Sequence, residues 1–336
     1  GHPPLAFGLQ SILFNLLGDG FYIDRLYSII MALITAWGIT LCWRLFNEKG
    51  TAWLPILLWI IVPITFWSYQ NNMLENTMTA FSLFSTYFIL KAAIKSKITY
   101  LIWGALFLIF ALLSKGVVAL FPLGIPLFYF LISSKNYLLK SIIGGVLLSL
   151  ISFLILLLIF LVFPESKPFL ANYIDIQVVA SLQEKNDVTT SNRLSILGFL
   201  FSNLLPVFIL TIVSFISKKR SNLKLKKESV LFFLIGLSAS LPIIISLKQR
   251  EFYLVPSIPF FTLAFAFYLK PIISNIDIKT KMAKWLKITF TSLIVVVMIF
   301  SISQFGKFHR NELMLKDIYV ISKVVPSGSA LSVKRN

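Results

Sequence analysis

The chain has 336 residues, of which 57% are hydrophobic and only 13% charged, and its net charge is +18 with a mean hydropathy of +0.87. A soluble domain has about 25% charged residues and could not bury this much apolar surface, so the composition indicates an integral membrane protein. We attribute the positive charge to membrane orientation and expect no nucleic-acid partner. The single cysteine, Cys42, excludes an intrachain disulfide framework.

Apolar segments of membrane-spanning length recur along the chain, which predicts an all-α polytopic membrane protein with about ten transmembrane helices. Residues 3–17 are apolar but short, so we expect an N-terminal juxtamembrane helix within an outer-face segment, 1–24. No signal peptide is visible, and the chain is expected to be N-terminally truncated. The predicted spans are 25–46, 51–69, 77–95, 98–115, 117–134, 138–163, 194–217, 229–247, 252–270 and 288–304.

The loops between these spans alternate in charge. One set of alternate loops holds most of the lysines and arginines and few acidic residues, while the other set is nearly balanced. Because positive residues favour cytoplasmic loops, the first set is predicted to be cytoplasmic. The predicted transmembrane bundle covers residues 25–304. With this orientation, the long loop 164–193 and a C-terminal tail, 305–336, lie on the outer face.

Several basic residues on the predicted outer face depart from this charge bias. Lys115 is flanked closely by apolar sequence, and Lys248 and Arg250 stand just before a span, with Tyr253 following. Fixed cations here could bind a phosphate group, and the planar fork of arginine suits that ligand. The plainer alternative is snorkelling and interfacial anchoring at the membrane edge.

Two further residues belong to the same face. Glu75 begins a predicted span among asparagines, where it could order a sugar-binding site or merely complement the helix dipole. His2 precedes two prolines and could contact a phosphate or a metal, although a lone histidine does not make a metal site. The sequence indicates no cofactor and assigns no metal ligands, while a divalent metal is left open.

The motifs occur in a characteristic order. They are Pro3-Pro4-Leu5, Gly18-Asp19, Arg25-Leu26, Met73-Leu74-Glu75-Asn76, Ser114-Lys115-Gly116, and Lys248-x-Arg250-x-x-Tyr253-x-x-Pro256. Together they resemble the polyprenyl- and dolichyl-phosphate-sugar-dependent membrane glycosyltransferases, the C-type enzymes similar to aminoarabinose transferases and protein O-mannosyltransferases. The resemblance covers about residues 1–270.

The resemblance implies a multispan helical bundle with a lipid-facing cavity at its outer face. A polyprenyl-phosphate sugar donor, held in the membrane lipid of the bacterial inner membrane, would pass its sugar to an extracytoplasmic acceptor, either lipid, glycan or protein. The resemblance places Lys115, Arg250 and Tyr253 near the lipid phosphate, puts His2 where the family often has lysine, and matches Glu75 to an acidic position. The family's catalytic aspartate lies before the Pro-Pro-Leu motif, so the catalytic residue of this chain is unknown.

Other functions remain open from the sequence. A transporter or lipid flippase would show two related halves with broken helices near the membrane midplane, and no such repeat stands out. A polysaccharide ligase or polymerase would also carry a long outer loop. A purely structural membrane subunit is the remaining alternative.

Overall fold

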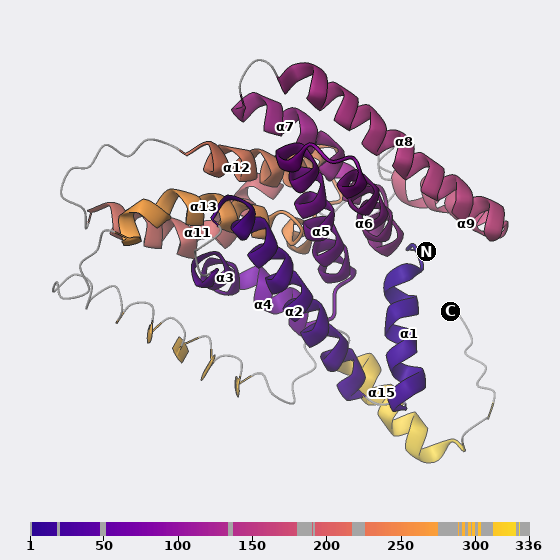
Figure 1. Ribbon diagram of the computed structural model, residues 1–336. Coiled ribbons are helices and arrows are strands. Elements are labelled where there is room, and N and C mark those ends of the chain that lie inside the picture. The colour runs from indigo at the N-terminus through magenta and orange to yellow at the C-terminus, as the bar shows by residue number, and fades with distance from the viewer. Residues whose placement is uncertain are drawn as a thin grey trace. The chain divides into compact units, whose positions relative to one another are not determined.

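The computed structural model describes two compact units, Gly1–Lys284 and Trp285–Asn336. The described residues are 2–18, 21–47, 52–133, 137–179, 190, 192–216, 226–274, 288, 291–292, 295–296, 298–299, 302–303, 312–326 and 329. Every regular element within these residues is a helix, which confirms the predicted all-α fold (Figure 1).

The first unit consists of helices in the following order along the chain. They are α1 (Leu5–Leu17), α2 (Phe21–Phe46), α3 (Trp53–Ile60), α4 (Pro63–Gln70), α5 (Leu74–Lys95), α6 (Thr99–Lys115), the 3-10 helix η1 (Val117–Gly124), α7 (Ile125–Ile132), α8 (Leu138–Val162), α9 (Ser166–Tyr173), the π-helix η3 (Ile174–Val179), α11 (Ser195–Ile216), α12 (Lys227–Ser240), the 3-10 helices η4 (Leu241–Ile245) and η5 (Glu251–Leu254), and α13 (Ile258–Ser274). The second unit contains α15 (Glu312–Val324), whose exposed apolar residues include Leu313 and Val324.

Membrane-spanning character is confirmed by length and composition. Within the described residues, five helices are long and apolar enough to cross a membrane, or six if the bent pair α3–α4 is one span. Shorter apolar helices cover Leu5–Leu17, Thr99–Lys115, Val117–Ile132 and Ile258–Pro271. The predicted span 288–304 falls largely outside the described residues. The number of ten spans therefore stays a prediction, as do the membrane-side boundaries at residues 24 and 304.

The predicted span 51–69 is divided into two helices. α3 and α4 meet at a bend of 74° because Pro63 starts α4 without an N–H to donate, and Val62 before it is extended, with ψ of 121°. The predicted span 117–134 also starts irregularly, as the 3-10 helix η1, which contains Pro122. Both interruptions follow from proline chemistry that an apolar pattern alone does not reveal.

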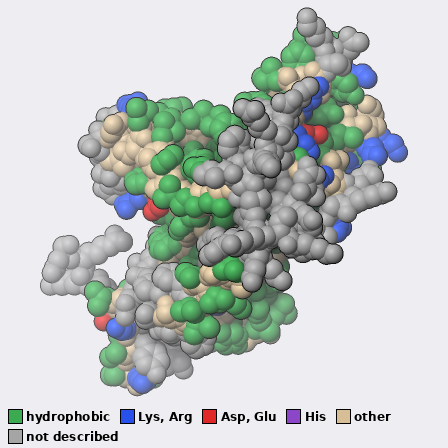
Figure 2. Space-filling model, turned by 90° about the vertical axis from the view of Figure 1, so that its left-hand side faces the viewer, with side chains coloured by type: hydrophobic (Ala, Val, Ile, Leu, Met, Phe, Trp, Pro, Cys, Tyr) green, Lys and Arg blue, Asp and Glu red, His purple; other side chains and the backbone are tan. Residues whose placement is uncertain are grey.

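Helix α5 lies at the centre of the first unit, where it packs against α2 and α6. Small residues permit this close packing, since a Cβ on Gly38 would lie 2.9 Å from Leu83 and one on Gly104 2.8 Å from Ile89. By contrast, α8 leaves many leucines and isoleucines exposed, and only a small share of its residues is buried. Hydrophobic side chains cover much of the described surface in Figure 2, as expected for a surface solvated by lipid.

Candidate functional site

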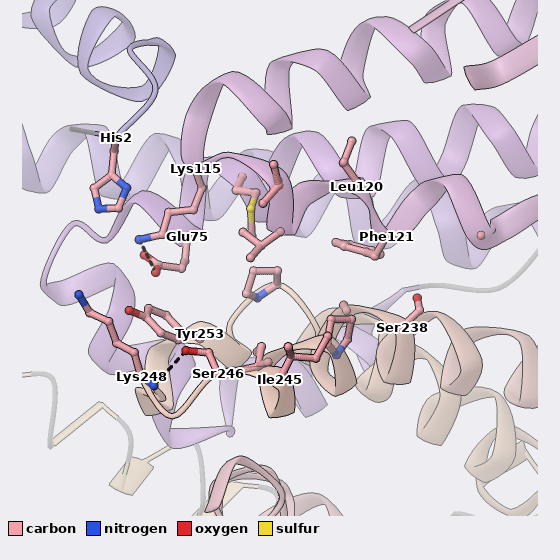
Figure 3. Close-up of a pocket in the computed structure, with 18 of the residues that line it drawn as sticks. His2, Glu75, Lys115, Leu120, Phe121, Ser238, Ile245, Ser246, Lys248 and Tyr253 are labelled. Atoms are coloured by element: carbon pink, nitrogen blue, oxygen red, sulfur yellow. Dashed lines mark hydrogen bonds and ion pairs between the residues drawn. The ribbon is translucent and has the colours of Figure 1, made fainter. Parts of the chain in front are cut away.

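A cavity of about 480 Å³ lies where the start of α5, the end of α6 and η1 face the segment between α12 and α13. Five of the six predicted binding residues line it: His2, Glu75, Lys115, Lys248 and Tyr253. Figure 3 shows these polar residues gathered at one end, while Leu120, Phe121 and Ile245 lie toward the other. The cavity is therefore amphipathic, with a charged end and an apolar end.

An ion pair forms the centre of the charged end. Lys115 Nζ lies 2.8 Å from Glu75 Oε1, and the two side chains are only 12% and 1% exposed. Lys115 ends α6 and Glu75 lies in the first turn of α5, so each charge also complements its own helix dipole. No described residue hydrogen-bonds to Glu75 Oε2, so Lys115 supplies the main compensation for a buried carboxylate.

Tyr253 lies beside this pair. Lys115 Nζ is 5.7 Å from the centre of the Tyr253 ring, within the range of a cation–π contact. The Tyr253 hydroxyl can donate a hydrogen bond to an anion.

His2 and Lys248 complete the charged end (Figure 3). Burial lowers the pKa of His2 to about 4, and the nearby charges of Lys115 and Lys248 contribute to the shift. His2 is therefore neutral at pH 7, and among the described residues nothing hydrogen-bonds to its Nδ1. Among the described side chains that line the cavity, the cations are Lys115, which is paired with Glu75, and Lys248.

Arg250, the sixth predicted residue, is exposed and does not line the cavity. It lies in extended backbone just before η5, the short helix that carries Tyr253. Its predicted role in phosphate binding stays a prediction.

Two buried carboxamides, missed in the sequence, hold the Lys248–Tyr253 segment against α11. Gln249 is 1% exposed, and its Oε1 accepts a hydrogen bond of 2.8 Å from the backbone N–H of Ile196. Its Nε2 donates to the carbonyls of Arg193 and Ser246. Gln249 therefore fixes the backbone beside Lys248 to the first turn of α11.

Asn203 of α11 forms the second clamp and is also 1% exposed. Its Oδ1 accepts a 3.0 Å hydrogen bond from the N–H of Ile64, at the start of α4, and its Nδ2 donates to Glu251 Oε1 at 2.6 Å. Phe252 also stacks on Trp67 of α4, with ring centres 5.8 Å apart. Asn203 thus joins the helix that leads to Glu75 with the short helix that carries Tyr253.

A tyrosine in the predicted outer loop 164–193 contacts the Lys115 turn. The Tyr173 hydroxyl donates to the Lys115 carbonyl and accepts from the Val117 N–H, both at 3.3 Å. It lies so close to Gly116 that a Cβ there would be 1.7 Å from the hydroxyl oxygen. Gly116 also has φ of +108°, a conformation that L side chains rarely adopt, so glycine is needed at this turn on both grounds.

The described residues contain no group of three or more His, Cys, Asp or Glu side chains that could hold a metal ion. The chemistry of the cavity is that of fixed cations and a neutral hydroxyl donor beside an apolar compartment. This combination suits an amphiphile whose anionic group is attached to a long apolar chain.

Comparisons with known proteins bear on the fold and on the family. In fold, the chain resembles ArnT from Cupriavidus metallidurans bound to undecaprenyl phosphate, with a TM-score of 0.64, 15% identity, and coverage of 93% of this chain and 56% of that one. The apo state of the same protein gives a TM-score of 0.57 at 16% identity over 82% of this chain and 50% of that one. The chain thus spans about half the length of these structures, and a comparison with curated protein sequences finds no match.

Residues 1–163 match the family model of the dolichyl-phosphate-mannose-protein mannosyltransferases. This match confirms, over residues 1–163, the resemblance expected from the sequence to the membrane glycosyltransferases that depend on polyprenyl- or dolichyl-phosphate sugars.

Proposed function

We propose that this protein transfers a sugar from a polyprenyl-phosphate donor to an extracytoplasmic acceptor, which can be a lipid, a glycan or a protein. The amphipathic cavity is the observation that carries the proposal, because Lys115, Lys248 and Tyr253 gather at one end and mostly apolar residues line the rest (Figure 3). A phosphate at the charged end would leave a polyprenyl chain in contact with the apolar walls. The family match and the ArnT fold support the same reaction type.

The reaction breaks the bond between the anomeric carbon of the sugar and a phosphate oxygen. An acceptor hydroxyl forms the new bond to that carbon and gives up its proton to a carboxylate acting as general base, while the electron pair of the broken bond stays on the lipid phosphate. This leaving group is stable as an anion and needs no strong general acid. The cavity's contribution is therefore to stabilise the charge that develops on the phosphate.

Lys115 and Lys248 would supply this stabilisation, and Tyr253 would donate a hydrogen bond. Glu75 holds Lys115 at the end of α6, with Nζ to Oε1 at 2.8 Å, so the cation is positioned before the donor arrives. Arg250 would contribute at the rim of the cavity, where its exposed side chain can reach a headgroup.

We place the active site on the outer face of a bacterial inner membrane. The supporting observation is the charge distribution, since the Lys115 end of α6 belongs to the nearly balanced set of loops. The donor would then be used from the leaflet that faces the acceptor.

The test is sugar transfer by the full-length protein in proteoliposomes. Lys115→Ala and Arg250→Ala should each lower transfer sharply, because each removes a cation assigned to the phosphate, while both variants still insert into the membrane. Lys95→Ala, at the opposite end of α5, provides a matched loss of one lysine and should retain wild-type transfer. Wild-type rates in both Lys115→Ala and Arg250→Ala would overturn the assignment.

A lipid flippase would behave differently in the same vesicles. It would move a labelled polyprenyl-phosphate sugar between leaflets without forming a glycosylated acceptor, and that result would overturn the proposed transfer.

A further inference from the structure

A second cavity, of about 300 Å³, lies at the opposite end of the α5–α6 pair from the candidate site. It is lined by the end of α5, the α5–α6 turn, α7 and the start of α8. Ile89, Leu101 and Ile125 are buried along its walls, whereas Lys97 and Lys140 are exposed. We call it the lysine groove, and nothing in the proposed sugar transfer uses it.

The charge balance of the groove is one-sided. None of the residues that line it is acidic. The residues that line the groove all fall within 89–147, a stretch that contains several lysines and neither aspartate nor glutamate. The groove lysines therefore differ from Lys115, whose charge is met by Glu75 at 2.8 Å. A cationic groove without an acid attracts an anion from outside.

The lysines are carried by well-defined local structure. Lys97 follows Ser96, which ends α5 in the left-handed conformation with φ of 52°, and the turn is closed by a backbone hydrogen bond from Tyr100 to Lys97. Lys140 Nζ lies 5.3 Å from the centre of the Tyr137 ring, which packs edge-on against Tyr129 with ring centres 5.9 Å apart. Both tyrosines line the groove. The aromatic pair thus supports one of the two cations.

The surroundings indicate a lipid rather than a small soluble anion. The groove is bounded by α8, whose apolar side chains are largely exposed; they include Leu139, Ile143 and Val146. Along this helix a Cβ on Gly144 would meet nothing within 4 Å, so the groove has open space beside the apolar surface. An acyl chain could lie there and continue onto the exposed face of α8.

We propose that the lysine groove binds an anionic phospholipid, with its phosphate at Lys97 and Lys140 and an acyl chain along the apolar wall beside Gly144. Arrays of basic residues at a membrane surface attract anionic headgroups, and the groove adds a defined place for the chain. The site is separate from the donor cavity, so its ligand would be a membrane component and not a reactant.

In the experiment, the full chain exchanges its bound lipid with vesicles of phosphatidylcholine that contain one part in five of phosphatidylglycerol. Native mass spectrometry then identifies the lipid that the protein retains. Wild-type protein should retain phosphatidylglycerol in preference to phosphatidylcholine. Lys97→Gln and Lys140→Gln should each lower this retention several-fold, because each removes one of two phosphate contacts. Lys95→Gln is the matched control, since Lys95 is exposed one residue before the turn and does not line the groove.

A second pair of variants tests the chain-binding part without altering charge. Gly144→Leu should fill the open space and lower phosphatidylglycerol retention, whereas Gly145→Leu, where the Cβ position is also open but which does not line the groove, should leave retention unchanged. Both replace a helical glycine by a better helix former, so neither is expected to impair folding.

Competition with inorganic phosphate distinguishes a bound phospholipid from a bound phosphate ion. Millimolar phosphate should not displace the retained phosphatidylglycerol if the acyl chain contributes to binding. Displacement by phosphate alone, or equal loss of retention in Lys95→Gln and Lys97→Gln, would overturn the proposal. Loss of sugar transfer in Lys115→Ala bears on the donor cavity and not on this groove, so the two proposals fail independently.

Discussion

The two ends of the α5–α6 pair handle positive charge differently. At the end with Lys115, the lysine is 12% exposed, is paired with a buried glutamate, and faces a segment held by two buried carboxamides. At the other end, Lys97 and Lys140 are exposed and line a groove without an acidic residue. The difference is that the first cavity holds its cation in a buried ion pair, whereas the lysine groove leaves its cations exposed to solvent.

The largest effect is expected from breaking the buried pair. Lys115→Ala leaves the Glu75 carboxylate, 1% exposed, without its cation, which should lower the free energy of unfolding by about 3 kcal/mol and abolish polyprenyl-phosphate binding. Thermal unfolding in detergent and lipid retention measure the two consequences.

The double variant Lys115→Met/Glu75→Gln separates stability from binding. Removing both charges should recover most of the lost stability but not the binding of polyprenyl phosphate. If Lys115→Ala alone unfolds at the wild-type temperature, the pair is not the buried, charge-compensated unit described above.

A smaller effect is expected at the carboxamide clamp. Asn203→Ala removes the hydrogen-bond acceptor of the Ile64 N–H and the donor to Glu251 Oε1. This loss should lower the free energy of unfolding by about 1–3 kcal/mol. As a positioning residue Asn203 should also weaken donor binding, because it joins α4 with the helix that carries Tyr253. Ser202→Ala, at an exposed neighbouring position, is the control.

Reversing the bond tests the positioning role directly. In Asn203→Asp/Glu251→Gln the side chain at 251 donates the hydrogen bond and the side chain at 203 accepts it. The affinity for the polyprenyl-phosphate sugar should therefore return toward the wild-type value, relative to Asn203→Asp alone. Equal affinity in Asn203→Ala and wild type would show that the clamp does not position the site.

The pH dependence of stability should report on His2. Its pKa is lowered to about 4 in the folded protein, from an ordinary 6.5, so the unfolded chain binds the proton more readily. The His2 contribution to stability is therefore complete above about pH 6.5 and is lost as the pH falls toward 4. The unfolding temperature of His2→Gln should decline less over this interval than that of the wild type, and parallel curves would contradict the assignment.

The smallest effect on stability is expected in the lysine groove. Lys97→Ala removes an exposed charge with no acidic partner lining the groove, so the free energy of unfolding in detergent should change by less than about 0.5 kcal/mol. If Lys97→Ala lowered the free energy of unfolding as much as Lys115→Ala, the two ends of the α5–α6 pair would not differ in how they hold positive charge.

Much of the bundle could be predicted from the sequence, because spans such as 25–46 and 138–163 are read directly from apolar runs of membrane length. The bend between α3 and α4 could not, since it depends on where Pro63 and Val62 fall within a continuous apolar run. The number of complete crossings is not determined by hydropathy alone, because α6 and α13 are shorter than a standard span.

For the candidate site, the sequence located six charged or polar residues at the edges of apolar segments, and five of those six line one cavity. Asn203 and Gln249 were missed because an amide inside or beside an apolar helix has no signal in composition; its role depends on which backbone groups the fold brings to it. Tyr173 was missed because its hydrogen bonds to the Lys115–Val117 turn join positions more than 50 residues apart, which only the fold brings together.

The central claim is that the amphipathic cavity binds a polyprenyl phosphate with its phosphate at Lys115, Lys248 and Tyr253. A polyprenyl phosphate carrying a photoreactive group on the isoprenoid unit nearest the phosphate tests it most directly, with the labelled peptides identified by mass spectrometry. We predict labelling of the apolar cavity wall around Val118 and Phe121, with loss of labelling in Lys115→Ala/Lys248→Ala. Equal labelling of that double variant, or labelling confined to the exposed face of α8, would contradict the account.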